Sequence, residues 1–167
     1  AAMAITVTHI SAATASLTWA LWERIKFGKA SLVGIVTGTI AGLASITPAS
    51  GFVGPWAALL IGAVAGILCQ EAVVLIRNKA KIDDTLDVFA VHGVGGIFGT
   101  IMIAALGAGS WAAQLGSLAI VGVYTTVVTV VLVLVCKAIT PLRVSKEVEV
   151  NGLDLSVHGE RAYDLSS

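Results

Sequence analysis

The chain has 167 residues, of which 57% are hydrophobic and only 12% are charged. A water-soluble domain carries roughly twice that share of charge, so the composition excludes an ordinary soluble protein and predicts an integral membrane protein in a lipid bilayer. Ten basic and ten acidic residues balance to zero net charge, which excludes the concentrated positive excess that a nucleic-acid partner requires.

Charged residues are absent from three long windows, residues 1–22, 30–70 and 88–136. A membrane span needs about 20 apolar residues to cross a hydrocarbon core of about 30 Å, so the windows predict one, two and two spans. A proline-bearing stretch at 47–55 divides the second window, and a glycine-rich stretch at 107–110 divides the third. The predicted fold is an all-α, polytopic transmembrane helix bundle. Its five helices are expected at about 1–22, 31–47, 55–76, 86–106 and 111–138.

All ten basic residues fall on one side of the predicted membrane, and the two loops on the opposite side carry no charge. The positive-inside rule therefore places the C-terminus in the cytoplasm and the beginning of the chain outside, in what we expect to be the cell (plasma) membrane. Trp19 and Trp22 close the first helix at the inner interface, and Trp56 and Trp111 open later helices at the outer interface. This arrangement is typical of an aromatic belt.

Small residues recur at four-residue spacing on three of the predicted helices. In lipid, such flat faces allow helix backbones to approach closely, so we expect a compact bundle. The glycines concerned are Gly34, Gly38, Gly42, Gly62, Gly66, Gly95 and Gly99.

The two cysteines, Cys69 and Cys136, lie in apolar runs and are expected to pack in the core.

The transmembrane domain is expected to cover residues 1–140, and residues 141–167 form a polar tail of mixed charge. A tail of this length is too short for a core of its own, so it is expected to be disordered or docked on another surface.

His92 lies six residues into the apolar run of the predicted fourth helix. An ionisable group at that depth suggests a functional role, although a structural histidine bonded to a neighbouring helix is the alternative. A neutral imidazole donates at one nitrogen and accepts at the other, which suits the transfer of protons along a dry path. His9 has Thr6, Thr8 and Ser11 beside it and is interpreted as structural.

Asp83, Asp84 and Asp87 cluster at the start of the predicted fourth helix, where carboxylates cap free N–H groups and complement the helix dipole. Glu71, about one turn before Arg77, is expected to make an interfacial ion pair or a bundle contact. The sequence holds no glycine-rich phosphate loop, nucleophile triad or metal-ligand cluster, so no enzyme, catalytic residue, cofactor or metal site is expected.

Three segments in order resemble the ammonium transporter (Amt/Mep) family. The segment DDTLDVFAVHGVGG at 83–96 resembles the tenth transmembrane helix, and AGLASITPASGFV at 41–53 resembles the eighth helix and its following turn. The segment GLDLSVHGERAYD at 152–164 resembles the cytoplasmic terminus. The resemblance runs from the seventh helix to the C-terminus of an eleven-helix, inverted-repeat fold. The Rhesus branch usually has a second histidine just after the pore histidine, where this chain has Val94, so the Amt branch is favoured.

This resemblance implies a homotrimer with one narrow apolar pore per subunit, lined by two facing histidines from the two inverted halves. His92 matches the second histidine, and Val88, one turn earlier, matches a pore-lining apolar residue. Asp84 stands eight residues before His92 and, with Asp87, is expected to support the start of the pore helix. The implied substrate is ammonium, which would cross as ammonia while the histidines relay its proton. The partner histidine belongs to the N-terminal half of the transporter.

The family likeness also assigns a role to the tail. Gly152, Asp154, His158, Gly159 and Tyr163 are expected to dock on a neighbouring subunit and to be read by a PII-type regulatory protein. The competing interpretation for this segment is a tail that serves assembly alone, and for His158 it is a solvated residue.

Two alternatives to transport remain open. The same fold could act as a non-conducting ammonium sensor that signals through the tail. The chain could also be one piece of a split or engineered transporter or sensor, an interpretation suggested by its start inside an apolar run.

Overall fold

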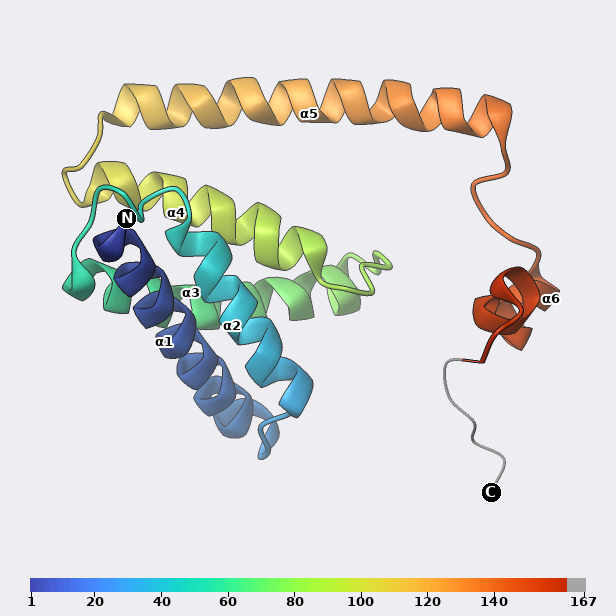
Figure 1. Cartoon of the computed structure of the whole chain (residues 1–167), viewed down its shortest axis with the longest axis horizontal. Helices are drawn as coiled ribbons and strands as arrows, with labels where there is room; N and C mark the ends of the chain where they lie inside the picture. Colours follow the sequence, from blue (N-terminus) through green and yellow to red (C-terminus); the bar gives the residue numbers. More distant parts are fainter. Residues whose placement is uncertain (162–167) are drawn as a thin grey trace. The chain divides into compact units, whose positions relative to one another are not determined.

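The computed structural model describes residues 1–161. These residues form helices joined by turns, with no strand in the described range, which confirms the all-α prediction. The chain divides into two compact units, Ala1–Ile120 and a second that begins at Val121 (Figure 1). Tyr163, one of the expected tail contacts, lies outside the described residues.

The first unit contains four complete apolar helices, two of which carry a π-helical turn, and the beginning of a fifth. The second helix is capped at its start by Ser31, whose hydroxyl accepts from the N–H of Gly34. The first helix ends at Gly28, whose φ of 80° is the left-handed conformation that glycine adopts without a Cβ clash. The elements are α1 (Ala2–Phe27), α2 (Leu32–Ile46), α3 (Pro55–Val74) continuing as η1 (Leu75–Lys79), and η2 (Phe89–Gly93) continuing as α4 (Val94–Ala105).

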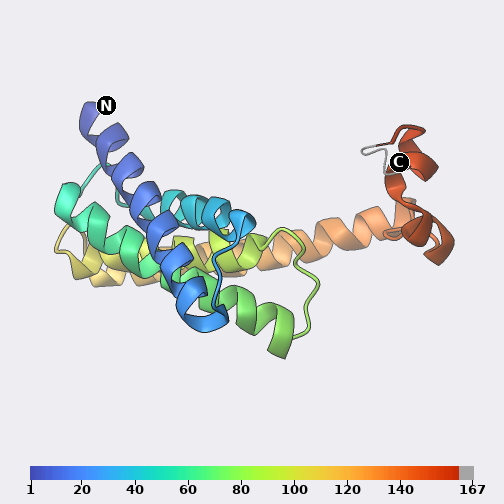
Figure 2. The ribbon, with the colours of Figure 1, turned by 90° about the horizontal axis from the view of Figure 1, so that it is seen from below.

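Helix α1 packs against both α2 and α3, and α2 also contacts α4 (Figures 1 and 2). The glycine faces make this packing close. A Cβ on Gly42 would lie 2.5 Å from the carbonyl oxygen of Ser11, and a Cβ on Gly38 would lie 2.6 Å from the Cβ of Trp19. Gly62 likewise faces the backbone of Ser11. Any side chain at these positions would force the helices apart, which confirms the packing interpretation of the small-residue spacing.

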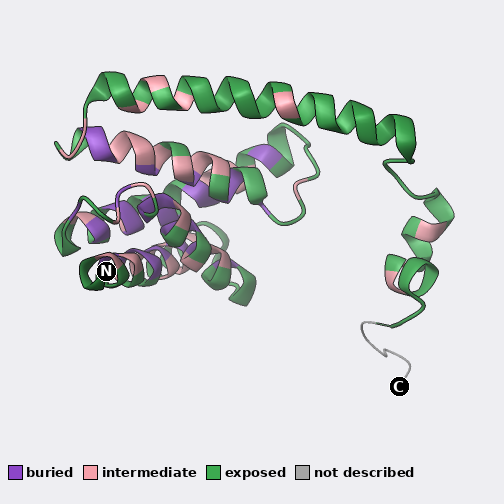
Figure 3. Cartoon of the chain, turned by 45° about the horizontal axis from the view of Figure 1, so that its top comes forward, coloured by how far each residue is buried: buried purple, intermediate pink, exposed green. Residues whose placement is uncertain are grey.

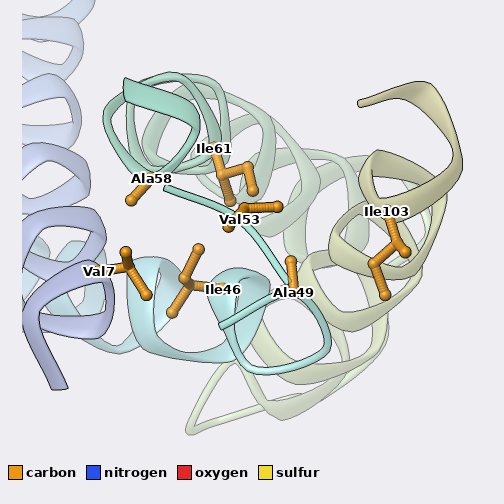
Figure 4. Close-up of a cluster of buried hydrophobic side chains, with 7 residues drawn as sticks. All are labelled: Val7, Ile46, Ala49, Val53, Ala58, Ile61 and Ile103. Atoms are coloured by element: carbon orange, nitrogen blue, oxygen red, sulfur yellow. The ribbon is translucent and has the colours of Figure 1, made fainter. Parts of the chain in front are cut away.

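The core of this unit is a cluster of buried aliphatic side chains from α1, α2, the following turn, α3 and α4 (Figure 4). A second cluster joins Trp19 of α1 to Ala41, Cys69 and Val91 on the other three helices. Together the two clusters fix the rotation of each helix about its axis. The first cluster contains Val7, Ile46, Ala49, Val53, Ala58, Ile61 and Ile103.

The aromatic-belt interpretation is wrong for Trp19, which is only 3% exposed. Its indole N–H donates to Oε1 of Glu23 at 3.1 Å, so its polar edge is satisfied inside the bundle and not by lipid headgroups. Trp56 and Trp111 are 84% and 52% exposed, as a belt requires.

Helix α5 (Trp111–Ile139) begins in the first unit and continues into the second. None of its residues, all of which the structure describes, is buried (Figure 3). The prediction that both cysteines pack in the core is therefore right for Cys69 and wrong for Cys136, which lies on this exposed helix.

Among residues 1–161, two helices are long and apolar enough to cross a membrane by length and composition, Pro55–Lys79 with 25 residues and Trp111–Ile139 with 29. At 1.5 Å per residue, the shorter apolar helix Leu32–Ile46 rises about 22 Å, less than a hydrocarbon core of about 30 Å. The number of spans, five, stays a prediction.

In the described part of the second unit, α5 is followed by two short helices, α6 (Lys146–Asn151) and the π-helical η3 (Asp154–His158), which contact each other. Ser145 caps α6 through its hydroxyl, and Arg143 pairs with Glu149 at 2.8 Å.

Candidate functional site

His92 lies in the π-helical turn η2, and its side chain is exposed in this chain. Val88, four residues earlier, is 52% exposed, and a Cβ on Gly96, four residues later, would meet nothing within 4 Å. These three positions therefore form one open stripe along the helix, which we call the open face. π-Turns inside α-helices are rare and occur frequently at functional sites.

The neighbouring face of the same helix, which carries Val91, Gly95 and Gly99, is closely packed. Val91 is 2% exposed, and a Cβ on Gly95 would lie 2.9 Å from the hydroxyl of Ser45 and 3.4 Å from the sulfur of Cys69. Gly99 faces the backbone carbonyl of Ser45 so closely that no side chain fits between them. The packing against α2 and α3 thus leaves the adjoining open face, with His92, uncovered by those two helices.

The start of this helix is held by two aspartates. The carboxylate of Asp84 accepts hydrogen bonds from the N–H of Val88 at 2.8 Å and of Phe89 at 2.9 Å. Asp87 is buried, and its Oδ1 lies 2.7 Å from Nε of Arg77. Asp84 and Asp87 therefore act on one turn, just before the apolar helix.

Asp84 and its neighbour Asp83 also border a cavity of about 460 Å³. Its lining combines apolar side chains from both sides of the turn with two carboxylates. The lining residues are Ile76, Ile82, Asp83, Asp84 and Phe89.

Glu71 makes the ion pair expected of it, with Lys26 of α1 at 2.7 Å, while its neighbour Arg77 pairs with Asp87. The indole N–H of Trp22 donates to the same carboxylate at 2.5 Å. Glu71 therefore ties the C-terminal end of α3 to that of α1.

His9 is exposed and lies beside Thr8 and Thr39 in a cavity of about 510 Å³ between α1 and α2. Two of the hydroxyls expected to satisfy it bond elsewhere. Thr6 donates to the carbonyl of Ala2, and Ser11 donates to that of Gly42. His9 and His92 lie on different helices, and no group of three or more potential metal-binding side chains occurs among residues 1–161.

The tail residues lie at the ends of the two short helices of the second unit. Gly152, with φ of 96°, ends α6, and Gly159, with φ of 71°, ends η3. Asp154 begins η3, and its carbonyl accepts the N–H of Gly159. His158 is exposed. Both glycines have positive φ, a conformation that favours glycine, so the backbone alone explains the residue type at each position and no binding partner is needed to explain it.

Known proteins resemble this chain along nearly its whole length. Residues 1–163 match the Ammonium Transporter Family. The chain belongs to that family. This confirms the resemblance inferred from the three motifs, and it makes the chain a member of a family of membrane transporters.

Curated relatives show the same likeness. The chain is 41% identical over 183 residues to a putative ammonium transporter of Methanothermobacter thermautotrophicus, covering 99% of this chain and 45% of that protein. It is 42% identical over 174 residues to the ammonium transporter Amt1 of Archaeoglobus fulgidus, covering 96% and 44%. The chain thus spans less than half the length of these relatives, which are named as transporters and not as enzymes.

Solved structures share the fold. A protein described as a sensor Amt protein matches with a TM-score of 0.81 and 30% identity, covering 93% of this chain and 42% of that one. Candida albicans Mep2 matches with a TM-score of 0.74 and 32% identity, covering 87% and 37%.

The π-turn around His92 and the ion pair between Arg77 and Asp87 were not expected from the sequence. Neither has a clear sequence signal, because both depend on how the chain reverses between α3 and α4.

Proposed function

We propose that this chain forms the second half of an ammonium transporter, in which Val88 and His92 line an apolar pore. The observation that carries the proposal is the division of one helix into a packed face and an open face. The open face bears His92, and the glycine-rich packed face beside it fixes the rotation of the helix so that this histidine stays exposed. A helix that served packing alone has no physical reason to carry an imidazole on its uncovered side.

The N-terminal half of the transporter is proposed to cover the open face and to supply the second histidine. Five spans of this chain then complete an eleven-helix, inverted-repeat protomer in the cell membrane, with the tail in the cytoplasm. Three protomers form a homotrimer, and the tail binds a PII-type regulatory protein. Asp84 and Asp87 support the helix that carries His92.

The chemistry of the substrate favours a proton relay. Moving a bare cation into hydrocarbon costs tens of kcal/mol, by Born solvation. Removing the proton from ammonium at neutral pH costs about 3 kcal/mol, because about two pH units separate its pKa from pH 7 at about 1.4 kcal/mol each. Ammonia then crosses the apolar section, while His92 accepts and returns the proton through its two ring nitrogens.

The test is ammonium-evoked current in liposomes that contain the complete transporter with His92→Ala. His9→Ala is the matched control, because His9 is also an exposed histidine on an apolar helix. We expect His92→Ala to abolish or strongly change the current and His9→Ala to leave it near wild type. Unchanged current, selectivity and uptake in His92→Ala would refute the relay.

Sensing is the second candidate, favoured by the match to a sensor Amt protein over 93% of this chain. A sensor binds ammonium in the same site without conducting it and passes occupancy to the tail. Uptake assays separate the two functions, because a sensor changes its tail contacts on ammonium addition while net uptake stays at the level of empty liposomes.

A further inference from the structure

Arg77 connects the end of α3 to the turn that starts the histidine-bearing helix. Its Nε lies 2.7 Å from Oδ1 of Asp87, and its Nη2 donates to the carbonyl oxygen of Thr85 at 2.9 Å. The Asp87 side chain is 12% exposed and that of Arg77 is 46% exposed. One planar guanidinium thus holds both a side chain and a backbone carbonyl of the same turn, which the point charge of a lysine does not reproduce.

The backbone of Asp87 has φ of 55°. Aspartate adopts the left-handed region more readily than most residues with a Cβ, but the conformation is still less favourable than a right-handed one and persists where surrounding contacts hold it. The N–H of Asp87 donates to the carbonyl of Asp84 at 3.1 Å, and the carbonyl of Asp87 accepts from the N–H of Val91 at 2.8 Å. Asp87 therefore lies where the turn ends and the helix hydrogen bonds begin, and its acceptor bond reaches the residue next to His92.

We propose that Arg77 is a positioning residue for His92, acting through Asp87. The guanidinium holds the Asp87 carboxylate, the carboxylate keeps Asp87 in its left-handed conformation, and that conformation sets where the π-turn Phe89–Gly93 begins. Releasing Asp87 lets the turn relax toward a regular helix, which rotates His92 relative to the packed face. This inference rests on the proposed function for its effect on transport, but its effect on the turn does not depend on transport.

The test compares Arg77→Gln with Lys79→Gln in the complete transporter. Lys79 is the other cation of η1, and it is exposed, so its replacement makes the same change of charge two residues away. We expect Arg77→Gln to speed amide hydrogen exchange across residues 88–93 roughly tenfold, since hydrogen bonds to charged groups carry that order of stabilisation. Lys79→Gln is expected to leave that exchange within about twofold of wild type. Where Arg77→Gln does not assemble, Arg77→Lys carries the same comparison, with a smaller increase.

A second measurement separates positioning from a general loss of structure. We expect Arg77→Gln to lower ammonium current in the wild-type background and to have no further effect in the His92→Ala background, because it acts through that ring. Unchanged exchange across 88–93, an equal effect of Lys79→Gln, or a full additional loss of current in His92→Ala would each overturn the proposal. If His92→Ala leaves transport unchanged, the proposed relay fails, and the exchange measurement still decides whether Arg77 holds the turn.

Discussion

Replacing Asp84 by alanine is expected to loosen the start of the helix that carries His92. The Asp84 carboxylate accepts the N–H groups of Val88 at 2.8 Å and Phe89 at 2.9 Å, the first two amides of that helix. Loss of a capping side chain costs about 0.5–2 kcal/mol.

A loss of about 1–2 kcal/mol corresponds to an opening equilibrium about 5- to 30-fold larger, at about 1.4 kcal/mol for each factor of ten. Amide hydrogen exchange at Val88 and Phe89 measures this opening directly in the assembled protein. Asp83→Ala is the matched control. The Asp83 carboxylate accepts from the Thr85 hydroxyl at 3.0 Å and from no helix amide among the hydrogen bonds of the described chain.

We expect exchange at the two amides in Asp83→Ala to stay within about twofold of wild type. Asp84→Asn, which keeps one acceptor oxygen, is expected to fall between wild type and Asp84→Ala. Equal exchange in Asp84→Ala and Asp83→Ala would refute the reasoning, because the two acids are neighbours and differ in the groups that they bind.

Three further outcomes are expected from the packing and the tail. Gly99→Ala places a methyl group against the backbone carbonyl of Ser45 in α2, so we expect it to lower the stability of the protein by about 1–3 kcal/mol. Gly116→Ala is the control, because a Cβ there meets no atom within 4 Å, and thermal unfolding of the assembled protein compares the two variants. Glu71→Gln weakens the partly exposed pair with Lys26 and is expected to cost at most about 1 kcal/mol, measured with Lys26→Gln in a double-mutant cycle. Removing residues 144–167 is expected to reduce transport or its response to a PII-type protein, and an uptake assay with and without that protein checks this.

The broad architecture was predictable because it follows from the preference of apolar side chains for lipid over water. Apolar windows and glycine spacing have a physical meaning in lipid that needs no knowledge of the fold, so helices and close packing followed directly. The depth of His92 in an apolar run singled it out in the same way. The expectation that Asp84 supports the start of its helix required only the local spacing and the family resemblance. The role of Asp84 in transport stays a proposal.

Contacts between helices were not predictable, because they depend on how each helix is rotated about its axis. The pair of Lys26 and Glu71 joins residues 45 positions apart. Tryptophan is a residue type typical of membrane interfaces, but Trp19 packs against Gly38 of α2 and is therefore buried. The left-handed conformation of Asp87 was not predictable either, because aspartate tolerates that conformation but most aspartates do not adopt it.

The open face of the histidine-bearing helix also has an energetic consequence for assembly. In lipid, apolar surface gives no drive for helices to associate, so the aliphatic side chains left exposed in this chain contribute little to recruiting another half. An exposed imidazole is different, because hydrocarbon offers it no hydrogen bond. Under the proposed function, covering His92 with a polar partner or a hydrated pore removes that penalty. The residue proposed to relay the proton then also favours association of the two halves.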